Sequence, residues 1–90
     1  MQNSTTEDIQ IQLVAALKAG LAPDAPEVQV LVRKHYESIT HYWIPDRERY
    51  IGLGEMYKEA PDFKKFYDAY HPDLVNFLAA AMRAFAEREL

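Results

Sequence analysis

The sequence predicts an all-α protein of about five helices joined by short loops. Apolar residues recur at helical spacing throughout the chain, and no segment alternates with period 2 for long enough to form a strand. Glycine or proline separates these periodic segments, at Gly20, Pro26, Pro45, Pro61 and Pro72. A chain of 90 residues has the length of one domain, so we expect residues 1–90 to form a single domain whose first few residues are flexible.

The first helix is predicted from Ser4 to about Ala19. Ser4 and Glu7 have the spacing of a capping box, in which a hydroxyl and a carboxylate satisfy free backbone N–H groups. Gly20 is a natural stop, because glycine adopts the left-handed conformation freely. The apolar residues on one face of this helix are Ile9, Leu13, Ala16 and Leu17.

The second helix is predicted to start near Pro26, with Asp24 or Ala25 as its cap. Trp43-Ile44-Pro45 should end it, because a residue before proline avoids the α conformation. Its predicted apolar stripe consists of Val28, Leu31, Val32, His35, Ile39 and Tyr42.

Asp46 is the predicted N-cap of the third helix. Tyr50, Leu53, Gly54 and Tyr57 share one face of it. Glycine inside a helix costs about 1 kcal/mol relative to alanine, so Gly52 and Gly54 require a reason. We expect another helix or a ligand to approach this face closely.

The last two helices are predicted from Pro61 and from Pro72, with Pro72 as the first helical residue of the fifth. The fourth carries an aromatic stripe of Phe63, Phe66, Tyr67 and Tyr70. The fifth has an inward face of Leu74, Phe77, Leu78, Ala81, Met82 and Phe85.

Composition excludes several classes of function. The net charge of −4 argues against direct binding of nucleic acid. Cysteine is absent, the three histidines have no metal-ligand spacing, and Gly52-Leu53-Gly54 lacks the third glycine of a dinucleotide loop. No nucleophile stands in a catalytic motif, and no secretory signal or membrane span is present. We therefore expect a cytoplasmic protein that is not an enzyme and uses no cofactor or metal.

Aromatic residues carry the remaining signal, since nine of the 11 lie between Tyr36 and Tyr70. Tyrosine combines a large apolar body with a hydroxyl, which suits both interfaces and pockets for amphipathic ligands. Spacing alone leaves two interpretations open: the rings line a ligand site, or they fill the core of a protein-interaction or dimerisation module. His35, on an apolar stripe, is typical of a hydrogen-bonded core histidine.

Residues 50–78 contain a string of spaced residues that resembles the TipAS antibiotic-recognition domain. The string is Leu53-Gly54-Glu55-Met56-Tyr57, then Pro61, Phe63 and Tyr67, then Pro72, Leu74, Phe77 and Leu78, with His35 and Ala19-Gly20 upstream. The resemblance implies a globin-like helical fold with an aromatic-lined cleft. It also implies an effector domain of MerR-type transcriptional activators that binds thiopeptide antibiotics or other bulky apolar drugs. Some members of that family lack the DNA-binding half and sequester the drug.

The same resemblance implies a set of ligand-binding residues and partners. The predicted cleft residues are His35, Tyr36, Ile39, Tyr42, Trp43, Tyr50, Met56, Tyr57, Phe66, Tyr67 and Tyr70. Ile51 and Gly52 precede the motif where the thiopeptide-binding member has a cysteine, so binding is expected to be non-covalent. Ala60 replaces the usual aspartate before proline, and Asp62 is expected to take over capping. DNA would be bound only by a separate domain, no membrane is involved, and the full-length protein is expected to be a homodimer.

Overall fold

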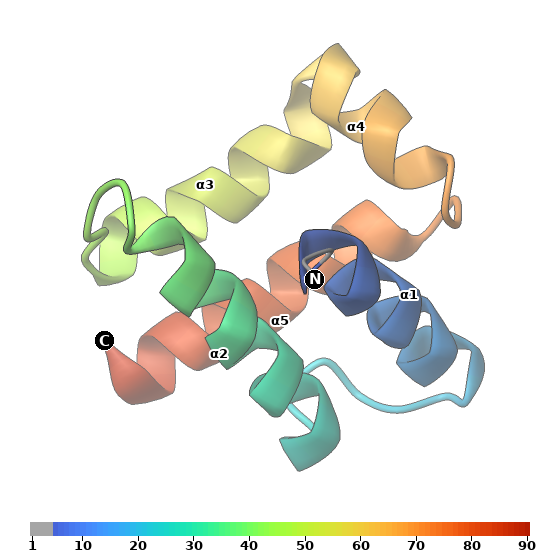
Figure 1. Ribbon diagram of the computed structural model, residues 1–90, viewed down its shortest axis with the longest axis horizontal. Coiled ribbons are helices and arrows are strands. Elements are labelled where there is room, and N and C mark those ends of the chain that lie inside the picture. The colour runs from blue at the N-terminus through green and yellow to red at the C-terminus, as the bar shows by residue number, and fades with distance from the viewer. Residues whose placement is uncertain (1–4) are drawn as a thin grey trace.

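The computed structural model describes residues 5–90 and their side chains from Asp8 onward. Within that range the chain forms five α-helices and no strand (Figure 1), which confirms the predicted all-α fold. The helices are α1 (Thr5–Lys18), α2 (Pro26–Ile39), α3 (Arg47–Glu59), α4 (Pro61–Asp68) and α5 (Leu74–Glu89). The predicted cap at Ser4 and the flexibility expected of the first residues lie outside the described residues.

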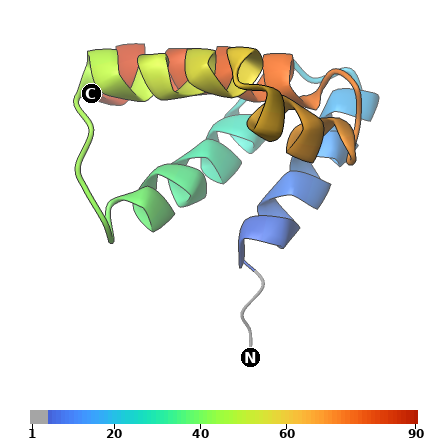
Figure 2. The ribbon, with the colours of Figure 1, turned by 90° about the horizontal axis from the view of Figure 1, so that it is seen from above.

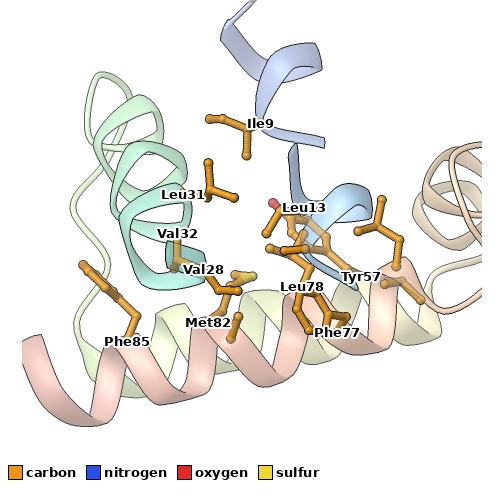
Figure 3. Close-up of a cluster of buried hydrophobic side chains, with 14 of the residues drawn as sticks. Ile9, Leu13, Val28, Leu31, Val32, Tyr57, Phe77, Leu78, Met82 and Phe85 are labelled. Carbon is orange, nitrogen blue, oxygen red and sulfur yellow. The ribbon is translucent and has the colours of Figure 1, made fainter. Parts of the chain in front are cut away.

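Helix α5 is the centre of the packing, and each of the other four helices contacts it. Helix α3 runs alongside α5, while α1 and α2 project from one side of the layer that α3 and α5 form (Figure 2). Figure 3 shows side chains of α5 pointing into the core toward those of α1 and α2. The predicted inward face of α5 is buried in full: Leu74, Phe77, Leu78, Ala81, Met82 and Phe85.

Two predicted helix ends have the expected geometry. Gly20 adopts a φ of 81°, and the N–H of Leu21 donates to the carbonyl of Ala16 at 3.1 Å, as in a Schellman motif. The carboxylate of Asp46 accepts a hydrogen bond of 2.9 Å from the N–H of Arg49. These two local signals fix the end of α1 and the start of α3.

Gly54 explains how α3 and α5 approach so closely. A Cβ atom at this position would lie 3.2 Å from Ala79 Cα and 3.3 Å from Met82 Sδ on α5. The expected close helix contact is therefore confirmed for Gly54. At Gly52 an added Cβ would meet no atom within 4 Å, so packing does not explain that glycine.

The prediction that Tyr42 belongs to the apolar stripe of α2 is wrong. Helix α2 ends at Ile39, and Tyr42 is 87% exposed in the following turn. The N–H groups of Tyr42 and Trp43 both donate to the carbonyl of Ile39, at 2.9 and 3.2 Å. This turn reverses the chain before Pro45, one helical turn earlier than the apolar spacing suggests.

Two predicted helix starts also differ from the structure. Helix α5 begins at Leu74 with Asp73 as N-cap, because a turn from His71 precedes it, in which Asp73 N–H donates to His71 Nδ1 at 3.0 Å. Pro72 is therefore not its first helical residue. The N-cap of α4 is Ala60, with no side-chain hydrogen bond, so Asp62 does not act as the cap.

Candidate functional site

Helices α2 and α3 contact each other through their side chains, without close packing of their backbones. No Cα atom of α2 lies within 8 Å of a Cα atom of α3. His35 and Tyr50 bridge this interval, with His35 Nδ1 and the Tyr50 hydroxyl 2.7 Å apart. Both residues are buried, and Tyr36 packs edge-on against Tyr50 with 5.2 Å between ring centroids. The space between the two helices is thus filled by rings.

These rings belong to a continuous series that we call the aromatic cluster. At one end Phe85 of α5 contacts both Tyr36 and Tyr50, and at the other Tyr67 contacts Tyr57, 5.4 Å between centroids. His35 stands edge-on to Tyr57 and joins the two halves. The members are His35, Tyr36, Tyr50, Tyr57, Phe63, Phe66, Tyr67, Tyr70 and Phe85. Helices α2, α3, α4 and α5 all contribute.

Burial keeps four ionisable side chains of the cluster uncharged. Burial lowers the pKa of His35 to about 4, so the ring is neutral near pH 7. Burial also raises the pKa values of Tyr50, Tyr57 and Tyr67 above their usual range. All four groups are therefore uncharged, and their hydroxyl and imidazole groups act as neutral hydrogen-bonding partners among apolar ring faces.

A buried amide from α1 reaches the same region. Gln10 is 1% exposed, and its side chain lies beside the Tyr67 hydroxyl, whose other polar neighbour is Tyr57. The Oε1 atom of Gln10 is buried and has no hydrogen-bond partner in the described part of the protein. An unpaired buried acceptor costs about 1–3 kcal/mol, so this atom lowers the stability of the fold.

The structure brings together seven of the predicted cleft residues and leaves four outside the cluster. Seven belong to the aromatic cluster: His35, Tyr36, Tyr50, Tyr57, Phe66, Tyr67 and Tyr70. Ile39 is half-buried and packs against the core. Tyr42, Trp43 and Met56 are exposed, at 87%, 44% and 42%. Phe66 lies at the surface end of the cluster, 47% exposed.

Phe63, Phe85 and Gln10 were not among the predicted site residues. Phe63 contacts Tyr57 at 5.0 Å between ring centroids, and its place in the aromatic stripe of the fourth helix was the available signal. Phe85 stands far along the chain from the other rings, and only the packing of α5 against α2 and α3 brings it there. Gln10 directly follows the buried Ile9 and is itself buried, although a glutamine is ordinarily expected at the surface.

The structure also has a surface groove that the sequence did not indicate. It lies between α1 and α2, with a volume of about 490 Å³. Its walls are mainly apolar, and none of the predicted cleft residues lines it. The lining residues are Gln12, Ala15, Ala16, Ala19, Leu21, Glu27, Val30, Leu31 and Lys34.

Neither a metal-binding cluster nor a membrane-spanning helix is found in the part of the chain that the structure describes. Among the described residues, no three His, Cys, Asp or Glu side chains come close enough together to hold a metal ion. In the same part of the chain, each helix is too short or too polar to span a bilayer.

The fold and the cluster define a small helical domain with an aromatic interior shared by four of its five helices. The chain belongs to the TipAS antibiotic-recognition domain family, whose model matches residues 2–85. It is 35% identical over 80 residues to the HTH-type transcriptional regulator SkgA of two Caulobacter vibrioides strains. That match covers 87% of this chain and 31% of the regulator, so the chain spans about a third of its relatives' length. No solved structure matches significantly.

Proposed function

We propose that this domain is the effector domain of a MerR-type transcriptional regulator and binds bulky hydrophobic small molecules, such as thiopeptide-like antibiotics or other drugs, without covalent capture. Membership of the TipAS family and the similarity to an HTH-type transcriptional regulator support the assignment to a regulator. DNA binding belongs to a separate domain, since the net charge of this chain is −4. The regulator is cytoplasmic, and the domain has no enzymatic activity.

The aromatic cluster is the observation on which the proposal rests. Rings fill the interval between α2 and α3, whose backbones do not approach within 8 Å. A flat apolar ligand offers the same kind of surface as these rings, so it can replace ring–ring contacts with ring–ligand contacts. Burial of ~300 Å² of ligand surface, at about 25 cal/mol per Å², contributes several kcal/mol before the costs of association.

Polar groups in the cluster would orient such a ligand. The hydroxyl of Tyr50, the imidazole of His35 and the amide of Gln10 are neutral and sit among apolar surfaces. Pockets for drug-sized molecules have this composition, mostly apolar with a few polar groups. Because cysteine is absent from the chain, thioether capture of a ligand is excluded.

A ligand would signal by changing the distance between helix pairs. Helix α2 is linked to α3 through side chains, so a molecule inserted among the rings favours a wider arrangement of the two. Only a difference in affinity between the two arrangements can shift their populations. The change in α2 and α3 is then passed to the DNA-binding part of the regulator.

The proposal is tested by titrating the domain with a panel of thiopeptides and hydrophobic drugs, followed by Trp43 fluorescence and calorimetry. We expect saturable binding of at least one compound, weakened several-fold by Phe66→Ala at the exposed end of the cluster. Ile11→Ala is the matched control, because Ile11 is 54% exposed on α1 and belongs to no ring contact of the cluster. A panel without any saturable response would count against the proposal.

The burial of Tyr50, Tyr57 and Tyr67 favours a second candidate, in which the rings are only core and the domain acts through its outer surface. Under this alternative, Phe66→Ala and Ile11→Ala are equally silent in every titration. A protein that sequesters drugs without regulating transcription would bind the same compounds. It is distinguished by an unchanged affinity of the full-length protein for promoter DNA when the drug is added.

A further inference from the structure

The groove between α1 and α2 is separate from the aromatic cluster. No lining residue of the groove takes part in a ring contact of the cluster. The floor includes the small side chains of Ala15 and Ala16 on α1 and of Ala19 directly after it, and Val30 and Leu31 line it from α2. Whatever occupies this groove therefore need not disturb the proposed ligand site.

Two large aliphatic side chains extend the groove into a wider apolar surface. Val30 is 56% exposed on the α2 side. Ile11 is 54% exposed on α1, one helical turn before Ala15 and on the same face. Single exposed aliphatic residues are ordinary, but here two of them border one apolar groove. The surface has the character of an uncovered helix-packing site.

The charges on this face of α2 are arranged symmetrically about the point between Val30 and Leu31. Glu27 lies three residues before Val30, and Lys34 lies three residues after Leu31. Both charged side chains line the groove. Within the described residues, neither has an ion pair or a side-chain hydrogen bond.

This arrangement is complementary to itself. When two α2 helices pack antiparallel about a two-fold axis between Val30 and Leu31, Glu27 faces the partner's Lys34, and Lys34 faces the partner's Glu27. A two-fold interface must match its own surface in this way, because the same patch is used by both copies. The small alanine side chains of the floor leave room for Val30 of the partner subunit to enter the groove.

We propose that the α1–α2 groove is a self-association surface, occupied by a second copy of this chain in an antiparallel two-fold arrangement. Two Glu–Lys pairs and the apolar contacts of Ile11 and Val30 hold the copies together. Each copy has a net charge of −4, which opposes association. The association is accordingly weak for the isolated chain, and its dependence on salt reflects both the attractive pairs and the net repulsion.

Charge reversal and charge exchange test the proposal. Sedimentation equilibrium of the 90-residue chain gives the dimer dissociation constant. Glu27→Lys or Lys34→Glu turns both attractive pairs into repulsive ones, so each should weaken the dimer about tenfold. The double variant Glu27→Lys/Lys34→Glu restores both pairs and should regain the original dissociation constant.

Control variants separate this surface from general charge effects. Glu59→Lys on α3 and Lys65→Glu on α4 change the net charge equally at exposed positions away from the groove. They should shift the dissociation constant much less than the groove variants. Val30→Asp, at a position that is 56% exposed, should abolish association while the circular dichroism spectrum stays helical.

Three results would overturn the proposal. The first is a wild-type chain that remains monomeric at millimolar concentration. The second is a double charge-exchange variant no better associated than the single ones. The third is a Val30→Asp variant that is folded and still dimeric. None of these results depends on whether the aromatic cluster binds a ligand.

Discussion

His35 Nδ1 and the Tyr50 hydroxyl lie 2.7 Å apart, and this hydrogen bond connects two helices whose backbones do not meet. Both side chains are buried, and their rings stand at 50° to each other with 5.9 Å between centroids. The pair therefore sets the separation of α2 and α3 at the middle of the aromatic cluster. It is also the part of the cluster whose disruption is easiest to measure.

The first prediction concerns the hydroxyl of Tyr50. Tyr50→Phe keeps the ring but leaves the buried Nδ1 of His35 without its partner, so we expect a loss of about 1–3 kcal/mol in the free energy of unfolding. Tyr36→Phe is the matched control, since the half-buried Tyr36 forms ring contacts and no described side-chain hydrogen bond. Urea denaturation measures both. Equal stabilities of the two variants would contradict the assigned hydrogen bond.

The second prediction concerns pH. Burial lowers the pKa of His35 from 6.5 to about 4, so the unfolded state binds this proton more readily than the folded state. The stabilising effect of a neutral His35 is fully present above pH 6.5 and is lost as the pH falls toward 4. The expected loss is about 3 kcal/mol, at 1.36 kcal/mol per pKa unit.

Comparison with His35→Gln isolates that contribution, because the variant retains a polar side chain but has no proton to gain. We expect the difference in unfolding free energy between wild type and variant to shrink between pH 6.5 and pH 4. His41 and His71 are present in both proteins and cancel. A difference that does not change over this range would show that His35 is accessible to water.

The helix ends that could be predicted from the sequence are those set by interactions between residues close together in the chain. Gly20 and Asp46 act on neighbouring backbone groups, and the sequence predicted both helix ends correctly. Tyr42 was misplaced because its spacing fits the stripe of α2, whereas a turn centred on Ile39 ends the helix first. The start of α5 was misplaced because the His71 ring, not Pro72, organises the preceding turn.

The candidate site was predictable only in part for a related reason. Rings close in sequence, such as Phe66, Tyr67 and Tyr70, form contacts that helical spacing already indicates. Phe85 and Gln10 reach the cluster through tertiary packing, which no local pattern encodes. The α1–α2 groove likewise depends on the angle between two helices, and its alanines appear in the sequence as ordinary helix formers.

The third prediction contrasts the two glycines of α3. Gly52→Ala should stabilise the protein by about 1 kcal/mol, because alanine favours the helix and the new Cβ meets no atom within 4 Å. Gly54→Ala should destabilise it by about 1–2 kcal/mol. Its Cβ would press on the backbone of Ala79 at 3.2 Å, and overpacking offsets the gain in helix propensity.

Thermal unfolding of both glycine variants checks this contrast, and the pair forms its own control. The chemistry of the substitution and the helix are the same, and only the distance to α5 differs. Should Gly54→Ala prove as stable as Gly52→Ala, then α5 would have to move away from α3 at no measurable cost. Such a result would contradict the close packing that positions Tyr50 and Tyr57.

The fourth prediction concerns Gln10, whose buried Oε1 atom has no hydrogen-bond partner in the described part of the protein. Gln10→Leu keeps a similar volume and removes both the unpaired acceptor and the contact of the side chain with Tyr67, so the two effects should offset and stability should change by less than about 1 kcal/mol. Gln10→Glu places a carboxyl in the same buried position and should destabilise the fold, more strongly at pH 8 than at pH 4, where the carboxyl is protonated. Chemical denaturation at the two pH values measures both effects. A destabilisation by Gln10→Leu larger than that by Gln10→Glu at pH 8 would refute the assignment.

The central claim is that the aromatic cluster is where a hydrophobic ligand binds. Its most direct measurement is a two-dimensional amide and side-chain NMR titration of the labelled domain with a binding thiopeptide or hydrophobic drug. We predict that the largest shifts, and contacts between ligand and protein protons, occur at His35, Tyr50, Tyr57 and Tyr67. Shifts confined to the α1–α2 groove, with the rings of the cluster unchanged at saturation, would contradict it.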